Sequence, residues 1–335
     1  WFCAFNIYDE NPESSLEWGS NGIGTFPKYR TPREQVFLKY YEAGQKGETL
    51  LINPIGEDEC PAHYEYLCSL PGVGDQLLKM KAAGIPFPKQ QIDHVAFFKH
   101  GYIIFITYEP VPETHDIFKR FARVFEQSYT RFLDLKNAEA QAREAEVELG
   151  LERVRARAMA MQKSDELREV VMTLYEQLKH LDFNAQACNI VIADKITGDR
   201  EFWVSGFTKE MYPESYKVPY INHPYVNEQL NAWKLGNKYA VYEYAGQTKK
   251  DFDAIFFSAT DFKNIPDDAK RMMIELPSVI FSTAFFNYGS IQALGSNPLS
   301  TENADILKRF AKVFEQTYTR FLDLQKAEAF LKMHK

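Results

Sequence analysis

The sequence is poor in cysteine, in long apolar runs and in positive charge. Its 335 residues include only four cysteines, Cys3, Cys60, Cys68 and Cys188. So few thiols exclude a disulfide scaffold in a chain of this length and are typical of a reducing compartment. No apolar run approaches the roughly 20 residues that a membrane helix requires. The amino-terminal run lacks the basic and apolar regions of a signal peptide, so we expect a cytoplasmic protein without membrane association.

The charge balance is acidic. The chain carries 46 acidic and 39 basic side chains, a net charge of −7. This argues against a general nucleic-acid binder, which presents a strongly basic face. Hydrophobic residues make up 45% and charged residues 25%, which indicates a soluble globular protein, and the length suffices for two domains. Aromatic residues reach 15%, enough for large cores or for aromatic-lined pockets.

An internal repeat is the strongest signal in the sequence. Residues 116–140 read DIFKRFARVFEQSYTRFLDLKNAEA, and residues 305–329 read DILKRFAKVFEQTYTRFLDLQKAEA. The two segments are identical at 20 of 25 positions. Weaker matches extend upstream, where Cys3, Asp9 and Trp18 align without a gap to Cys188, Asp194 and Trp203. A period this long indicates two copies of a whole domain, with residues 1–133 repeated as residues 188–322.

The repeat predicts the domain boundaries. We expect a first domain over 1–133, a helical, coiled-coil-like linker over 134–163, a second domain over 164–324 and a helical extension over 325–335. A helical stretch precedes the second copy, whereas nothing precedes Trp1. We therefore expect that a matching amino-terminal helix belongs before the first copy, in a longer chain.

Each copy has the pattern of an α+β domain. Two short β-type runs separated by a polar turn open each copy, as at 5–8 and 16–18, and predict a hairpin. A segment of helical spacing, another strand and a second hairpin follow. Pro110 and Pro298 precede the final helix of each copy, as expected at a strand-to-helix boundary. The order predicts two antiparallel sheets flanked by helices and joined by a long helix.

The segment between the copies is rich in helix-forming residues and lacks proline, and with the preceding helix it predicts a helix of more than 60 residues. Two apolar stripes at 3-4 spacing change phase near Gly150. The stripes indicate either pairing with a second copy of the chain or packing on the chain's own domains. Charge along the helix is segregated, but it does not settle whether such a pair is parallel or antiparallel. The two stripes are Leu135, Ala138, Ala142, Ala145 and Leu149, and Val147, Leu151, Val154, Ala158 and Met161.

The runs KRFAKVFEQTYTRFLDLQKAEA and LERVRARAMAMQKSDEL resemble the tandem GAF-type sensor domains of Bacteroidetes-type bacterial signalling proteins, such as sensor histidine kinases. The resemblance covers nearly the whole chain. It implies a central antiparallel sheet of about six strands with helices on either side. It further implies a homodimer that binds a small ligand over the sheet, or only dimerises, and relays a signal through long helices to an output domain.

The sequence departs from better-known members of that family. It has no Asn-Lys-x-Phe-Asp-Glu run like that of cyclic-nucleotide-binding GAF domains and no Cys-His pair like that of bilin-binding ones. It also lacks the phosphoacceptor and nucleotide-binding motifs of a kinase. The ligand and any cofactor therefore stay unknown, and if the parent protein is such a kinase, the chain is its sensor portion only.

Three motifs could carry chemistry, and each has a simpler explanation. Cys60, His63 and Cys68 offer zinc-ligand types within nine residues, but no fourth ligand is evident and the second copy has no counterpart. His115 opens a long helix, where a phosphoacceptor could lie, but the second copy has Ala304 there. Gly19, Gly22 and Gly24 are more typical of a turn or bulge than of a phosphate loop, because no P-loop lysine follows. We expect no metal site and no enzymatic activity.

The aromatic residues of the second copy are the best candidate site. Over a sheet they could line a ligand pocket whose polar tips orient the ligand, or they could fill a ligand-free core. The first copy is poorer in such residues, so we expect the second copy to be the one that binds. The candidate ligand-binding residues are Trp203, Tyr212, Tyr216, Tyr220, His223 and Trp233.

The sequence thus predicts a sensory or regulatory module that binds a small ligand, dimerises through its long helices, or does both. A ligand-free dimerisation and spacer unit is the main alternative, and an unrecognised enzyme is a further one. A change in helix register at Gly150 is the expected route of the signal.

Overall fold

The computed structural model of the chain describes residues 2–21, 24–163, 166–206 and 215–333. It divides into two compact units, Trp1–Glu139 and Ala140–Lys335, which we call domain 1 and domain 2. Each contains one six-stranded antiparallel sheet flanked by helices, which confirms the predicted fold class. Within the described ranges, no helix combines the length and apolar character needed to cross a bilayer.

Domain 1 is built on a sheet with the strand order β3-β2-β1-β6-β5-β4, in which all neighbours are antiparallel. A 3₁₀ turn over Pro112–Thr114 leads into its last helix. Its elements are β1 (Phe2–Ile7), β2 (Ser14–Ser20), β3 (Tyr29–Pro32), α1 (Gln35–Gln45), β4 (Leu50–Ile55), α2 (Cys60–Ser69), α3 (Val73–Ala82), β5 (Gln91–Phe98), β6 (Gly101–Thr107) and α4 (His115–Ala160), the helix that continues into domain 2.

Domain 2 repeats this topology. Its sheet has the order β10-β11-β12-β7-β8-β9, which is the order of domain 1 read from the other edge. Its elements are α5 (Leu167–His180), β7 (Ala187–Ala193), β8 (Arg200–Gly206), β9 (Ser215–Val218), α6 (Pro224–Lys234), β10 (Tyr239–Ala245), α7 (Gly246–Ala259), the 3₁₀ turn η3 (Asp261–Asn264), α8 (Asp267–Glu275), β11 (Ser278–Phe286), β12 (Gly289–Gly295) and α9 (Thr301–Met333).

The tight turn of the second hairpin shows how closely the two copies correspond. Phe98 pairs with Gly101 in domain 1, and Phe286 pairs with Gly289 in domain 2. A Cβ atom at either glycine would lie 1.8 Å from a backbone oxygen of the neighbouring strand. Only glycine therefore allows the central strands to approach each other at this point.

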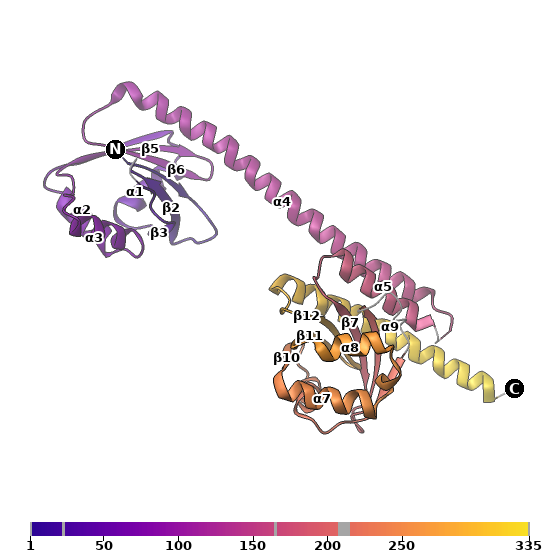
Figure 1. Cartoon of the computed structure of the whole chain (residues 1–335). Helices are drawn as coiled ribbons and strands as arrows, with labels where there is room; N and C mark the ends of the chain where they lie inside the picture. The colour runs from indigo at the N-terminus through magenta and orange to yellow at the C-terminus, as the bar shows by residue number, and fades with distance from the viewer. Residues whose placement is uncertain (1, 22–23, 164–165, 207–214, 334–335) are drawn as a thin grey trace. The chain divides into compact units, whose positions relative to one another are not determined.

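The two faces of each sheet pack against different helices. In domain 1, α1, α2 and α3 cover one face (Figure 1). Phe118 and Ala122 of α4 pack on the other. In domain 2, α6, α7 and α8 cover the corresponding face, and α5 and α9 cover the opposite one together with the second half of α4. Because side chains alternate along a strand, neighbouring residues point to opposite faces of the sheet and pack against different sets of helices.

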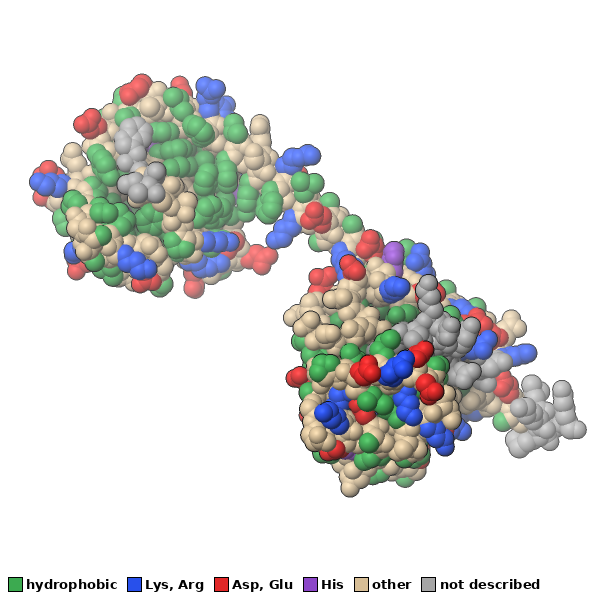
Figure 2. All heavy atoms as spheres, in the orientation of Figure 1, with side chains coloured by type: hydrophobic (Ala, Val, Ile, Leu, Met, Phe, Trp, Pro, Cys, Tyr) green, Lys and Arg blue, Asp and Glu red, His purple; other side chains and the backbone are tan. Residues whose placement is uncertain are grey.

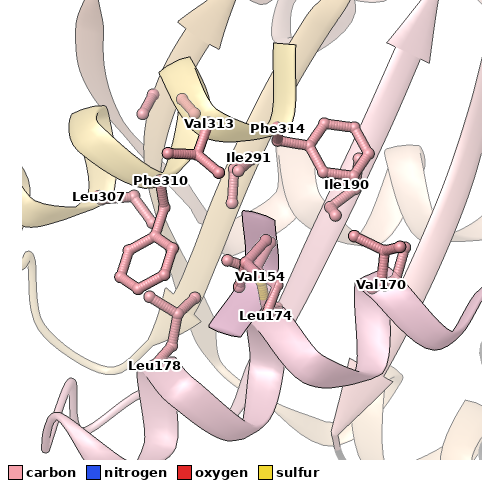
Figure 3. Packing of buried hydrophobic residues seen from close by; sticks show 14 of the residues in the cluster. Val154, Val170, Leu174, Leu178, Ile190, Ile291, Leu307, Phe310, Val313 and Phe314 are labelled. Carbon is pink, nitrogen blue, oxygen red and sulfur yellow. The ribbon is translucent and has the colours of Figure 1, made fainter. Parts of the chain in front are cut away.

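The second half of α4 belongs to the core of domain 2. One of the two predicted stripes (Val147, Leu151, Val154, Ala158 and Met161) is at most 4% exposed and packs with α5 and α9. Figure 3 shows Val154 of α4 and Leu174 of α5 among Phe310 and Phe314 of α9. For this stripe the chain's own domain is the packing partner, so the second half of the predicted linker 134–163 contributes to the core of domain 2.

The predicted helix of more than 60 residues, interrupted only at Gly150, is broken at a different place. Helix α4 ends at Ala160, and α5 begins at Leu167. Gly150 lies inside α4 without interrupting it, and a Cβ atom there would lie 3.4 Å from Cζ of Phe310. This distance is an ordinary contact, so α9 packs on α4 at this point with room for a methyl group, and the break in the helix comes ten residues after Gly150.

Candidate functional site

Domain 1 contains a cavity of about 510 Å³ between its sheet and the helices α1, α2 and α3. Strands β2, β5 and β6 contribute its floor through Glu17, Asp93 and Ile104. The helices and the segment that follows α3 contribute mostly apolar walls. A concave, largely apolar space with a few converging polar groups is typical of a small-molecule site.

Glu17 is the first of two carboxyl groups on the cavity floor. It lies in β2 opposite Asn6 of β1 and Tyr29 of β3, and it is 5% exposed. The hydroxyl of Tyr29 donates a hydrogen bond to Oε1 of Glu17 at 2.5 Å, and the amide of Asn6 donates to Oε2. Thr31 donates to Oδ1 of Asn6 at 3.1 Å, which holds that amide in place. The carboxyl group is thus positioned by a network within the sheet.

Asp93 is the second carboxyl group. It lies in β5 and is 1% exposed. Tyr40 of α1 donates to Oδ2 at 2.5 Å, and Nε2 of Gln91 donates to Oδ1 at 2.8 Å. Asn53 donates to the Tyr40 hydroxyl at 3.1 Å, and Tyr64 of α2 donates to Oε1 of Gln91 at 2.8 Å. Two donors, Tyr40 and Gln91, therefore contact this group directly, and Asn53 and Tyr64 hold those two donors in place.

Burial controls the ionisation of the cavity. It raises the pKa of Glu17 to about 7, against the hydrogen bonds from Tyr29 and Asn6 and with a smaller contribution from Asp93. It raises the pKa of Asp93 to about 6 and lowers the pKa of His63, which also lines the cavity, to about 4. No lysine or arginine is among the described residues that line the cavity. Its ionisable chemistry is therefore that of carboxyl groups near their titration point, without a cationic side chain.

Aromatic side chains shape the cavity walls. The rings of Tyr64 and Phe87 stack with centroids 4.7 Å apart, and those of Phe2 and Phe26 meet edge to face at 5.4 Å. Tyr108, at the edge of the cavity, is 48% exposed. Figure 2 shows hydrophobic side chains gathered on the visible face of domain 1. Flat aromatic walls of this kind suit a ligand with a ring or another apolar body.

The corresponding space in domain 2 is largely filled. Its cavity measures about 90 Å³. Sequence alignment and strand register place Phe202 at the position of Glu17, and Phe281 at the position of Asp93. Phe256 of α7 packs with its ring centroid 4.4 Å from that of Phe262 and 6.2 Å from that of Phe202. Aromatic rings therefore replace the acids and occupy the space.

The structure separates the predicted site residues of the second copy. Trp203 faces α5 and α9, on the opposite side of the sheet from Trp233, which packs with α6. Tyr216 packs on Phe262, with ring centroids 4.8 Å apart. Tyr212 lies outside the described residues.

The remaining predicted residues lie around α6. His223 is the N-cap of α6 and accepts a hydrogen bond from the backbone of Tyr225. Tyr220 is 44% exposed and donates to Asn227 at 2.8 Å. Nε1 of Trp233 donates to the backbone oxygen of Phe286 at 2.8 Å. Of the five described candidates, none lines the 90 Å³ cavity.

The other predicted motifs form no reactive centre in the part of the chain that the structure describes. No group of three or more His, Cys, Asp or Glu residues is arranged there for a metal ion. Cys60 donates through Sγ to the backbone of Pro88 at 3.3 Å, and the His115 ring lies 5.2 Å from that of His94. A Cβ atom on Gly19 would meet Phe2 and Ala4, which indicates close packing on β1, and Gly22 lies outside the described residues.

The acids of domain 1 are not among the predicted site residues, because single acidic residues in a strand give a weaker sequence signal than the aromatic cluster of the second copy. A signal was available: strand-forming runs that carry Glu17 and Asp93 align with runs that carry Phe202 and Phe281. A position that is phenylalanine in one copy of a duplicated strand is an inward-facing position, so an acid there is buried in the other copy. Buried acids of this kind mark candidate functional sites.

No model of a protein family matches the chain, and no curated protein matches it.

Proposed function

We propose that this chain is a sensory module of two GAF-like domains in which domain 1 binds a small molecule. The 510 Å³ cavity with two buried carboxyl groups carries this proposal. Burying acids is costly, and filling the space with phenylalanine, as in domain 2, would avoid that cost. Domain 2 shows that the same fold forms without these acids. Their presence in the cavity of domain 1 therefore supports a role in ligand recognition.

The lining defines the class of ligand. An aromatic or aliphatic body would lie against the rings of Tyr64 and Phe87, and its N–H or O–H groups would donate to Glu17 and Asp93. An ammonium group would also stabilise the ionised form of both carboxylates. Their pKa values of about 7 and 6 are close enough to neutral pH for a nearby positive charge to keep them ionised. Anionic ligands are disfavoured because the described lining offers them no cation.

Association through α4 is the second part of the proposal. Ile117, Phe121, Val124 and Phe132 of domain 1 are 47–61% exposed. Their counterparts in domain 2 lie beneath α4 and α5 and are at most 8% exposed. These counterparts are Ile306, Phe310, Val313 and Phe321. The same helix face is thus a packing surface in one copy and exposed in the other.

The exposed face continues along α4 at seven-residue spacing. Phe121, Leu135, Ala142 and Leu149 share one heptad position, in which Ser128 is the one polar step, and Ile117, Val124, Ala138 and Ala145 share the other, in which Arg131 is the polar step. All are exposed in the single chain. A sustained heptad of this kind favours pairing with the same helix of a second copy, which would make a homodimer. Long helices from the pair would then relay the state of domain 1 to a cytoplasmic output domain.

A ligand-binding test separates this function from a ligand-free spacer. Thermal denaturation of the full chain would be followed with small aromatic compounds that are cationic, neutral or anionic. We expect compounds that carry N–H groups to raise the midpoint, since they bind only the folded state. Ile106→Phe, which fills the cavity, should abolish the rise, while Tyr220→Phe, an exposed change in domain 2, should retain it. If no compound acts through the cavity, the spacer alternative is favoured.

The dimer has its own test. Light scattering on the full chain should give about twice the 38.8 kDa mass of one copy. Leu135→Glu should shift the mass toward one copy, because it places a charge in the heptad stripe. Leu235→Glu is the matched control, since Leu235 is 82% exposed and lies outside the stripe. A mass of one copy for the unaltered chain would contradict association through α4.

A further inference from the structure

The small cavity of domain 2 contains a buried arginine that lacks a compensating charge. Arg200 opens β8, between Ala193 of β7 and Val218 of β9, and is 6% exposed. Its Nε and Nη2 atoms are buried and have no hydrogen-bond partner. Its guanidinium lies 5.1 Å from the ring of Phe202, which is a weak substitute for an anion. Burial lowers the pKa of Arg200 only to about 10, so the group stays charged near neutral pH.

The other charged groups of this cavity do not neutralise Arg200. Lys249 and Asp253 of α7 both line it, and Nζ of Lys249 lies 2.5 Å from Oδ2 of Asp253. The same Nζ donates to the backbone oxygen of Met273 at 2.9 Å. Asp253 is thus matched by Lys249, and one positive charge remains in excess among the described lining residues.

A polar chain borders the same space. Asn189 donates to Gln292 at 3.4 Å, Gln292 donates to Gln229 at 3.3 Å, and Gln229 donates to the hydroxyl of Tyr244 at 2.7 Å. All four residues line the cavity, and Oδ1 of Asn189 is buried without a hydrogen-bond partner. The cavity therefore holds unused hydrogen-bonding capacity in addition to the unpaired guanidinium.

Size and lining restrict the anion. A volume of about 90 Å³ holds a few non-hydrogen atoms. Much of the remaining lining is apolar, including Phe252, Phe256 and Val279. A guanidinium offers paired N–H groups that match the two oxygens of a carboxylate. A carboxylate on a short aliphatic chain satisfies the cation and the apolar wall together.

We propose that domain 2 binds a small aliphatic monocarboxylate, with its carboxylate on Arg200 and its chain against the aromatic wall. The counterpart of Arg200 in domain 1 is Ser15, so this site is particular to the second copy. The proposal does not depend on ligand binding in domain 1. The two domains would then bind ligands of opposite charge.

The test uses acetate, propanoate and butanoate as probes on the full chain, with sodium chloride adjusted to keep the ionic strength constant. We expect a saturable rise of the thermal midpoint in the unaltered protein. Arg200→Met should abolish the rise. Arg200→Lys, which keeps a charge but loses the paired N–H groups, should weaken binding by about tenfold. Arg309→Met, at an arginine that pairs with Glu144 and Glu148, should leave the rise intact.

Several results would overturn the proposal. One is the same rise in Arg200→Met as in the unaltered chain, and another is no rise with any of the three probes. An Arg200-dependent rise with phosphate or sulfate alone would keep an anion site but reject the carboxylate. Without any probe, Arg200→Met should be at least as stable as the unaltered chain, because it removes an uncompensated buried charge. A large fall in its midpoint would show that the protein itself supplies a partner for Arg200, and that would also reject the site.

Discussion

Domain 1 and domain 2 share a strand order and a turn geometry, yet the space over the sheet differs completely between them. Domain 1 keeps about 510 Å³ open around Glu17 and Asp93, whereas domain 2 keeps about 90 Å³ beside Arg200 and fills the rest with phenylalanine. The difference shows that the alternating apolar pattern determines the fold. A few inward positions determine how much space stays open over the sheet and which charged side chains line it.

The helix that closes each domain supports the same conclusion from the other face of the sheet. Phe121 and Phe310 hold equivalent positions in a nearly identical helix, and they are 56% and 0% exposed. Among the described residues, α5 and the second half of α4 pack against this helix in domain 2, whereas in domain 1 the same helix face is exposed. The sequence repeat therefore predicts which helix face is apolar. The neighbouring helices determine whether that face is buried within the chain or exposed to a partner.

The largest expected effect comes from truncating those two phenylalanines. Phe310→Ala should lower the free energy of unfolding of domain 2 by about 3–5 kcal/mol, because it leaves a cavity in the core. Phe121→Ala should change the unfolding of domain 1, measured on the single chain, by no more than about 0.5 kcal/mol. Denaturant unfolding followed by circular dichroism measures both. Equal losses for the two variants would mean that the copies do not differ in how this face is packed.

A smaller effect is expected from the pH dependence of domain 1. The pKa of Glu17 is about 7 in the folded protein, against an ordinary value of 4.5. Between these values the folded state holds a proton that the unfolded state has lost, so the free energy of unfolding falls as the pH rises from about 4.5 to about 7. The expected loss is about 3 kcal/mol, since one pKa unit corresponds to about 1.4 kcal/mol.

Glu17→Gln isolates this contribution because it imitates the protonated carboxyl group at every pH. Denaturant unfolding at several pH values should show a weaker decline in this variant than in the unaltered chain. Asp93→Asn should remove a separate part of the decline at lower pH, because the pKa of Asp93 is about 6. An unchanged pH profile in Glu17→Gln would show that Glu17 is ionised in the folded protein across this range.

The smallest effect is expected at Gly150. Alanine favours a helix over glycine by about 1 kcal/mol. Its Cβ atom would lie 3.4 Å from Phe310 and 3.6 Å from Cβ of Gln177, within ordinary contact. Gly150→Ala should therefore stabilise domain 2 by up to about 1 kcal/mol in thermal or denaturant unfolding. A clear destabilisation would show that α9 and α5 leave no room for a methyl group at this position.

Much of the fold could be predicted from the sequence because its signals are local. The strands β1, β2, β5 and β6 have short β-type runs bounded by turns, and the repeat placed α4 and α9 at equivalent points. The edge strand β3 was missed because it has four residues and ends at Pro32. The pairing of β1 with β6 joins segments about 100 residues apart, and no local pattern encodes it.

The candidate site was harder to predict, for two physical reasons. Phe202, Trp203 and Val204 are successive apolar residues of β8, so alternation could not show which of them faces the cavity. The two α4 stripes looked equivalent in sequence, although one is buried in domain 2 and the other is exposed. In both cases the deciding factor is which helix covers a face, and this depends on contacts between distant segments.

We propose that domain 1 holds a site selective for donor or cationic ligands, and that phenylalanine at the positions of Glu17 and Asp93 makes domain 2 unable to bind them. Titration of the full chain with phenylethylamine and with phenylpropanoate, followed by calorimetry, tests this claim most directly. The account predicts that the amine binds, that the carboxylate does not bind in domain 1, and that Glu17→Phe with Asp93→Phe abolishes amine binding. Amine binding that persists in the double variant, or no amine binding at all, would contradict it.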